Sequence, residues 1–224
     1  MQIPLIALGR LNVTRFIVGG NPFAGYSHQS PKRDAAMRAW YTDDRIVETF
    51  FQAQALGLNA VLCRGDAHMV GCLQRYWREG GSMAWIAQSP WEAETAVAGV
   101  QFCLDRGARA CFIHGGVVDH LIAQERFAEL EAATSRIKAA GVPAGIAGHV
   151  PADFRWAERN LDLDFYMVSY YNPTARQQAP QHHPEADERF AIEDRDERVA
   201  LIPELKRPVI HYKILAAGRT PAAE

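Results

Sequence analysis

The chain has 224 residues, of which 48% are hydrophobic and 22% charged, and its formal net charge is -2. This is the composition of an ordinary globular protein, and the small net charge gives no electrostatic reason to expect nucleic acid or an anionic membrane as a partner. No stretch approaches the roughly 20 apolar residues of a membrane span, and the chain does not begin with a basic and then apolar leader. We therefore expect one cytoplasmic domain over residues 1–224 that acts on a small molecule, with no prediction of its oligomeric state.

Four cysteines lie at positions 63, 72, 103 and 111 and show no Cys-x-x-Cys spacing. Cys111 falls inside an apolar run and Cys103 inside a helical pattern, as is typical of small buried side chains. The cysteines therefore predict reduced thiols rather than a disulfide framework.

The first predicted elements are two short strands within residues 3–18, joined by a turn at Gly9 and Arg10. Alternating polarity in the second strand gives way to the apolar run Phe16-Ile17-Val18, which we count as the first strand of a larger sheet. The glycines at 19 and 20 and the proline at 22 then predict a loop that is not helical.

From residue 43 onward, segments with a 3.6-residue apolar period alternate with short apolar runs. The predicted helices are residues 43–56, 69–78, 92–106, 125–140, 152–159 and 191–202. The predicted strands are residues 59–63, 83–87, 108–113, 144–147, 164–169 and 208–213. The polar segment 174–190, which contains His182 and His183, predicts a loop.

Seven apolar strands that alternate with helices predict a parallel α/β sheet. An open doubly wound sheet would also fit the alternation. We favour a TIM-type (β/α) barrel because a polar residue follows nearly every strand and because the N-terminal hairpin could cover the bottom of a barrel. An eight-stranded barrel needs one more strand and helix, so we expect the barrel to be incomplete at the C-terminus, with the eighth element truncated, lost or supplied by a partner.

The residues that follow the predicted strands form the candidate site, because in a barrel the carboxyl ends of the strands meet on one face. They are Asn21, Arg64, Asp66, His68, Gln88, His114, Asp119, His149, Tyr170, His211 and Lys213. His114 and His149 each follow an apolar strand and adjoin glycine, which favours a functional role over a structural hydrogen bond. With Asp66, His68 or Asp119 they could bind a divalent metal, but no metal-binding motif is present, so we assign no metal ligands.

Charged residues in this set have two interpretations each. Arg64 and Asp66 flank one glycine and form either a loop salt bridge or a clamp for an anion with a carboxylate base. Lys213 ends an apolar strand, so it is either a buried ion-pair partner or a lysine with a lowered pKa that suits acid–base or Schiff-base chemistry. His211 lies two residues earlier and is predicted to share the face of Lys213.

The chain resembles the aldo/keto reductases in four stretches that occur in the same order. They are residues 8–20 (LGRLNVTRFIVGG), 112–115 (FIHG), 145–149 (GIAGH) and 170–173 (YYNP). The resemblance implies a barrel, an NADP cofactor and a catalytic histidine at His114. It also implies that Tyr170 stacks on nicotinamide and that Asn21 and Gln88 lie at the cofactor.

Other catalytic residues of that family are replaced. Cys63, Arg64 and Gly65 stand where the family has Asp-Thr-Ala, and Gln88 stands where it has lysine. The leading hypothesis is a reductase-like oxidoreductase in which Lys213 or Asp66 replaces the lost proton donor. The alternative is a metal-assisted or lysine-dependent lyase, isomerase or hydrolase that uses His114, His149, Asp66, Arg64 and Lys213. A third hypothesis is a catalytically silent barrel that binds a ligand. In each of the three hypotheses, the residues predicted to contact the substrate or ligand are Asp119, His211 and His68.

Overall fold

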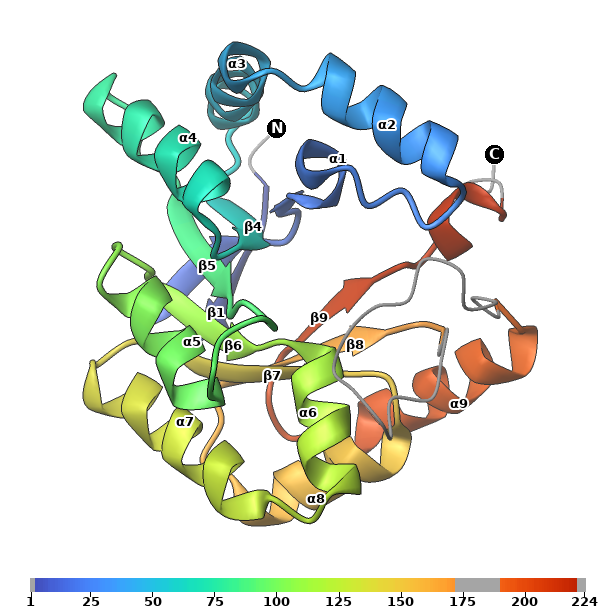
Figure 1. Ribbon diagram of the computed structural model, residues 1–224. Coiled ribbons are helices and arrows are strands. Elements are labelled where there is room, and N and C mark those ends of the chain that lie inside the picture. The colour runs from blue at the N-terminus through green and yellow to red at the C-terminus, as the bar shows by residue number, and fades with distance from the viewer. Residues whose placement is uncertain (1–2, 172–189, 221–224) are drawn as a thin grey trace.

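The computed structural model describes residues 3–171 and 190–220 and contains a seven-stranded parallel sheet that curls into a TIM-barrel-like α/β fold (Figure 1). The strands lie side by side in chain order, from β3 through β9. They are β3 (Val18–Gly19), β4 (Ala60–Arg64), β5 (Ala84–Gln88), β6 (Ala110–Ile113), β7 (Ala144–Gly148), β8 (Phe165–Ser169) and β9 (Val209–Tyr212). The predicted fold class is therefore confirmed.

A separate antiparallel hairpin, β1 (Leu5–Leu8) and β2 (Leu11–Thr14), precedes the sheet. Its turn is built on Gly9, whose φ of 54° is a left-handed conformation that glycine adopts readily. Leu8 and Val13 of the hairpin are buried in one cluster with residues on the inner side of the curled sheet, such as Phe112 and Phe165. The hairpin thus covers one end of the barrel interior, as its position in the sequence predicted.

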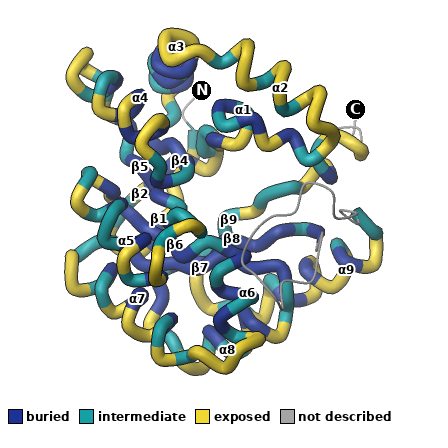
Figure 2. Tube along the Cα trace, in the orientation of Figure 1, coloured by how far each residue is buried: buried dark blue, intermediate teal, exposed yellow. Residues whose placement is uncertain are grey.

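Helices follow the strands and cover the outer side of the sheet, so that the central strands β4 to β8 are largely buried and the outward sides of the helices are exposed (Figure 2). They are α3 (Asp43–Ala55), α4 (Ala67–Arg78), α5 (Ala96–Leu104), α6 (Gly115–Ala123), α7 (Phe127–Ala139), α8 (Pro151–Asn160) and α9 (Ile192–Leu201), with two short turns, η1 (Ile202–Glu204) and η2 (Ala216–Gly218). None of the described helices combines the length and the apolar character needed to cross a bilayer.

Three helices were not predicted from the sequence. The segment after β3, expected to be non-helical, forms the short helix α1 (Asn21–Ala24), because Pro22 lies in its first turn, where proline is tolerated. The helix α2 (Pro31–Trp40) buries no residue and so has no apolar period to detect, although Ser30 caps its start. The helix α6 begins with Gly115 and Gly116, which are poor helix formers.

Side chains alternate between two cores along each strand. On β6, Ala110 and Phe112 face the inner cluster, whereas Cys111 and Ile113 face the cluster between sheet and helices. The same alternation occurs on β4, β5 and β8. Because side chains on a strand point to opposite faces in turn, this parity decides which residue at each strand end points toward the barrel axis.

The two ends of the sheet, β3 and β9, are not paired with each other among the described residues. A contact nevertheless joins the chain near both ends, because the Gln29 side-chain amide donates to the carbonyl oxygen of Ala217 at 2.7 Å. The loop after α1 and the turn η2 therefore meet at the carboxyl end of the strands, close to the residues described next.

Candidate functional site

A pocket lies at the carboxyl ends of the strands, and six of the seven strands contribute a residue at or immediately after their last position. Its lining consists of Gly20, Asn21, Ala24, Tyr26, His28, Arg64, Met69, Gln88, Trp91, His114, Gly115, Ala147, His149, Met167, Tyr212 and Lys213. Arg64 continues the inward parity of Ala60 and Leu62 on β4, and His114 continues that of Ala110 and Phe112 on β6. Strand periodicity therefore aims these polar side chains at one another.

The pocket lining contains two cationic side chains, of which Arg64 is paired with Glu92 beside the pocket. It contains Arg64, Lys213 and three histidines, and it contains no aspartate or glutamate among the described residues. Tyr26, Trp91 and Tyr212 supply aromatic surface. A pocket whose described lining carries cations and no carboxylate favours a small anionic molecule. The surrounding low-dielectric protein concentrates the positive potential inside the pocket, and this potential attracts an anion.

His149 is held by a buried carboxylate behind the pocket wall. Its Nδ1 lies 2.7 Å from Oδ2 of Asp119 on α6, and its backbone nitrogen donates to Oδ1 of Asp119 at 3.1 Å. Both side chains are 5% exposed. Since a carboxylate only accepts hydrogen bonds, Nδ1 carries the proton, and the neutral ring keeps Nε2 as its basic atom. Nε2 lies 3.4 Å from the hydroxyl of Tyr212, whose ring lines the pocket.

A second buried acid, Asp153 in the first turn of α8, supports this pair. Burial, the charge of Asp119 and a hydrogen bond to Asp119 raise the pKa of Asp153 to about 7. Below about pH 7 Asp153 therefore keeps its proton, which its hydrogen bond directs to Asp119. The two carboxyl groups thus share one proton, and Asp119 connects Asp153 to the His149 ring through hydrogen bonds.

Arg198 on α9 holds the backbone at the same place. Its guanidinium is 2% exposed and Nη2 donates to the carbonyl oxygen of His149. Its Nη1 donates to the backbone oxygen of Asp194 at 2.9 Å. Burial lowers the pKa of Arg198 from its usual value. The His149 main chain is thus anchored from α6 and from α9.

His114 caps the start of α6. Its Nδ1 accepts a hydrogen bond from the backbone nitrogen of Gly116 at 3.1 Å, and its own backbone nitrogen donates to Ser89 Oγ at 3.1 Å. Because Nδ1 accepts, the neutral ring carries its proton on Nε2. The two pocket histidines therefore have opposite tautomers: His149 is suited to accept a proton and His114 to donate a hydrogen bond.

Arg64, at the end of β4, is fixed by several partners. Nη1 donates to the Tyr26 hydroxyl at 2.8 Å, Nη2 pairs with Glu92, and the guanidinium carbon lies 5.5 Å from the Trp91 ring centroid. Asp66 Oδ2 is 3.8 Å from Arg64 Nε, while Asp66 Oδ1 accepts from the backbone nitrogen of Met69 and caps α4. The partially buried guanidinium is thus pre-oriented at the pocket.

Lys213 also lines the pocket, immediately after β9. Its φ of 58° is left-handed, so the strand alternation stops at Tyr212 and both residues can face the pocket. Its Nζ lies 5.9 Å from the ring centroid of Phe190.

Other residues predicted for the site lie elsewhere. His211 does not share the pocket face of Lys213, because it has the outward parity on β9; its Nδ1 instead meets the hydroxyl of Tyr170 at 3.2 Å. Neither Tyr170 nor His211 lines the pocket. Asp66 and His68 line a neighbouring cavity between α1, α3 and α4, and Asp119 lies behind His149 rather than on the pocket surface.

Of the residues predicted to bind a cofactor, some line the pocket and one does not. Asn21 and Gln88 line the pocket, and Tyr170, which the resemblance places under nicotinamide, does not. Two of the three residues predicted at the cofactor thus lie in the pocket lining. Among the metal-ligating side chains that the structure describes, no group of three within metal distance includes His114 or His149. His182 and His183 lie outside the described residues.

Sequence reasoning missed the residues that complete the site. Tyr212 could have been found from strand parity, because it continues the inward positions of β9. Asp153 and Arg198 carry no sequence signal, since each acquires its role through a helix that packs behind the strand ends. Tyr26 and His28 lie between residues 24 and 42, for which the sequence predicted no element.

Similarity to known proteins is found among solved structures. No family model and no curated protein matches the chain. Among solved structures, the TTHB071 protein from Thermus thermophilus, soaked with ZnCl2, is 14% identical with a TM-score of 0.43, and the match covers 58% of this chain and 64% of that one. QR15, an aldolase, is 14% identical with a TM-score of 0.48 over 73% of this chain and 69% of that one. This chain thus matches less than two thirds of the length of the first structure.

Proposed function

We propose that the protein is an enzyme that transfers a proton at a carbon atom next to the carbonyl group of a small anionic molecule, as lyases and isomerases do. The observation that carries the proposal is the Asp119–His149 pair at the wall of a pocket whose lining holds cations and no carboxylate among the described residues. A histidine whose tautomer is set by a buried carboxylate is a suitable general base at neutral pH.

In this reaction Nε2 of His149 takes the proton from the substrate carbon. The resulting imidazolium donates from Nδ1 to the ionised Asp119, which stabilises the new positive charge. The electron pair left by the proton moves to the carbonyl oxygen. Positive charge from Arg64 and Lys213, together with the Nε2 hydrogen of His114, stabilises the developing oxyanion.

Return of the proton from His149 to a different carbon gives an isomer. Alternatively, the same base takes a proton from a hydroxyl group, and a carbon–carbon bond breaks to leave the enolate. Both outcomes share the enolate, so exchange of the carbon-bound hydrogen with solvent tests them together.

The test measures deuterium incorporation in heavy water by proton NMR, with pyruvate, oxaloacetate and dihydroxyacetone phosphate as probes. We expect the protein to accelerate exchange of at least one probe and His149→Gln to reduce this rate by about 100-fold or more, the usual contribution of a general base. His120→Gln is the matched control, because His120 is on α6 beside Asp119 but does not line the pocket.

Two results would contradict the proposal: no exchange with any of the probes, or exchange that His149→Gln leaves at the rate of His120→Gln. Circular dichroism of both variants separates loss of the base from loss of the fold.

Carbonyl reduction with NADP is a second candidate, supported by three residues of the same pocket. His114 has the tautomer that donates to a carbonyl oxygen, and Asn21 and Gln88 lie in the lining. A nicotinamide would supply the hydride, and these residues would hold and polarise the carbonyl group. Titration with NADPH, followed by its fluorescence, distinguishes the candidates: saturable binding supports reduction, and its absence together with deuterium exchange supports proton transfer alone.

A further inference from the structure

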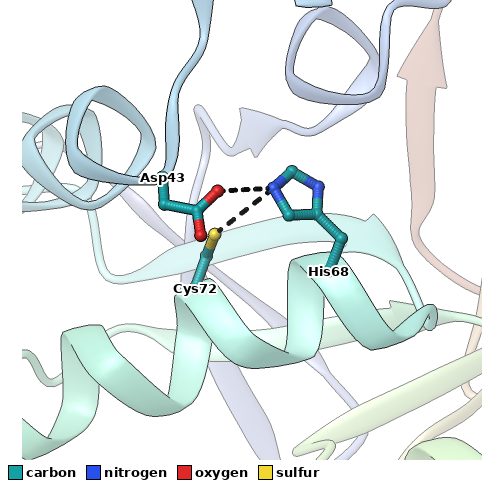
Figure 3. Close-up of side chains that lie close together, drawn as sticks. All are labelled: Asp43, His68 and Cys72. Atoms are coloured by element: carbon teal, nitrogen blue, oxygen red, sulfur yellow. Dashed lines mark hydrogen bonds and ion pairs between the residues drawn. The ribbon is translucent and has the colours of Figure 1, made fainter.

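Three metal-ligating side chains from two helices converge outside the strand-end pocket (Figure 3). They are Asp43, His68 and Cys72, and their ligand atoms all lie within 4.8 Å of one another. Nε2 of His68 is 2.8 Å from Oδ1 of Asp43 and 3.9 Å from Sγ of Cys72. Nε2 of the imidazole thus faces both the carboxylate and the thiol, which lie next to each other (Figure 3).

Local structure explains why they meet. His68 and Cys72 are four residues apart on α4 and therefore lie on one face of that helix. Asp43 is in the first turn of α3, after the capping residue Thr42. The two helices are packed by aromatic contacts such as Phe50 against Tyr76, with ring centroids 5.5 Å apart. The rigid packing of α3 on α4 fixes the carboxylate opposite the histidine.

The surroundings favour a cation. The cavity beside the cluster is lined by Asp43, Asp44, Asp66 and His68. Among the described residues of this lining, Arg38 is the one lysine or arginine. Arg75, on the same helix as Cys72, is engaged by Asp44 and Glu79. This carboxylate-rich cavity contrasts with the strand-end pocket, whose lining holds cations.

We infer that Asp43, His68 and Cys72 form a binding site for Zn²⁺, with a fourth position open to water on the cavity side. Nitrogen, sulfur and oxygen ligands in tetrahedral arrangement are typical of zinc, and the thiolate selects zinc over magnesium or calcium. Zinc–ligand bonds of about 2.0–2.3 Å place tetrahedral ligand atoms about 3.3–3.6 Å apart. The three ligand atoms lie within 4.8 Å of one another, so side-chain rotations that move them by about 0.5–1 Å convert the cluster into a site. On binding, the thiol proton of Cys72 passes to solvent, and the metal replaces the hydrogen bond between His68 and Asp43. The proton that His68 Nε2 donates in that hydrogen bond leaves through solvent, and the neutral ring then carries its proton on Nδ1.

Because the ligands come from two helices, the ion joins the start of α3 to α4. Cys72 is buried, whereas Asp43 and His68 are exposed, so the metal enters from the solvent side and its sulfur ligand lies on the protein side. The site is separate from the Asp119–His149 pair and does not depend on the proposed reaction.

The test is titration of the reduced protein with Co²⁺, which reports both geometry and ligand type by its absorption. We expect one equivalent to produce the intense visible bands of tetrahedral cobalt and a thiolate-to-cobalt charge-transfer band in the near ultraviolet, with Zn²⁺ displacing the cobalt. Cys72→Ala abolishes the charge-transfer band, and His68→Ala and Asp43→Asn weaken binding by about tenfold or more.

Matched controls are available in the chain. Cys103→Ala removes another fully buried thiol, and Asp44→Asn removes the carboxylate next to Asp43, so both should keep the charge-transfer band. His149→Gln should keep it as well, which makes this test independent of the proposed function. A thermal melt gives a second readout, in which Zn²⁺ raises the Tm of the protein and of Cys103→Ala but not that of Cys72→Ala.

The inference is overturned if one equivalent of Co²⁺ gives no tetrahedral spectrum, if the charge-transfer band persists in Cys72→Ala, or if Cys103→Ala loses it to the same extent.

Discussion

Two buried carboxyl groups and one histidine set the protonation of the strand-end pocket. Asp119 accepts from the His149 ring at 2.7 Å, and Asp153 donates its proton to Asp119 from the other side. The pKa of Asp153 is raised to about 7, first by burial and then by the negative charge of Asp119. The folded protein therefore binds a proton at Asp153 over a pH range in which the unfolded chain has lost it.

This difference in proton binding predicts how Asp153→Asn changes the stability. The unfolded carboxyl group titrates near pH 4, so the free energy of unfolding falls as the pH rises from about 4 to 7, and the contribution is gone above pH 7. The uncharged asparagine still donates to Asp119 but does not titrate. We expect the stability of Asp153→Asn, relative to the wild type, to be greater at pH 8 than at pH 5 by about 2.5 kcal/mol.

Urea unfolding at the two pH values, followed by tryptophan fluorescence, measures this change. Asp196→Asn, which replaces an exposed carboxylate on α9, is the control and should show the same difference from wild type at both pH values. Equal effects of Asp153→Asn at pH 5 and pH 8 would show that Asp153 is ionised in the folded protein.

At the scale of elements, the segment between β3 and α1 is fixed by close contact with β4. A Cβ atom at Gly20 would lie 2.4 Å from Cβ and 3.0 Å from Cα of Cys63, and main-chain atoms cannot move aside cheaply. The backbone nitrogen of Gly20 also donates to the carbonyl oxygen of Leu62 at 2.8 Å. This approach places Asn21 at the edge of the pocket.

The adjacent glycines therefore respond differently to the same substitution. We expect Gly20→Ala to lower the free energy of unfolding by about 2 kcal/mol or more, because the chain must move away from β4. Gly19→Ala should change it by less than about 0.5 kcal/mol, because nothing lies within 4 Å of the added methyl group. Urea unfolding of the two variants tests the contact, and similar values for both would contradict it.

On the scale of the whole molecule, the barrel has an inner core that depends on the N-terminal hairpin. Leu8 is 1% exposed and packs in the inner cluster, while Leu5 of the same strand is 54% exposed. The hairpin thus contributes apolar surface to the interior of the curled sheet at the end opposite the pocket.

Two leucine truncations measure that contribution. We expect Leu8→Ala to cost about 2–4 kcal/mol, the usual range for a buried leucine, because the methyl groups leave a cavity under the strands. Leu5→Ala should cost less than about 0.5 kcal/mol, since its side chain is largely solvated. Comparable losses in urea unfolding for the two variants would mean that the hairpin does not plug the inner core.

The parallel sheet and six of the helices were predictable from the sequence because burial on both faces produces continuous apolar runs, and amphipathic helices carry a 3.6-residue period. The helices α1, α2 and α6 were not, because α2 buries no residue and the other two begin with residues that weaken a helix signal. A short helix that is held by its contacts leaves little trace in local sequence.

The sequence by itself determined which residues end the strands, and a parallel barrel brings such residues to one face whatever their identity. Arg64, Gln88, His114 and His149 meet at the pocket for this reason. Only the tertiary structure decided that Asp119 and Asp153 stand behind His149, that Tyr212 rather than His211 faces the pocket, and that Asp43 meets His68 and Cys72. These pairings join residues on different helices and strands, and their distances depend on packing that no local pattern records.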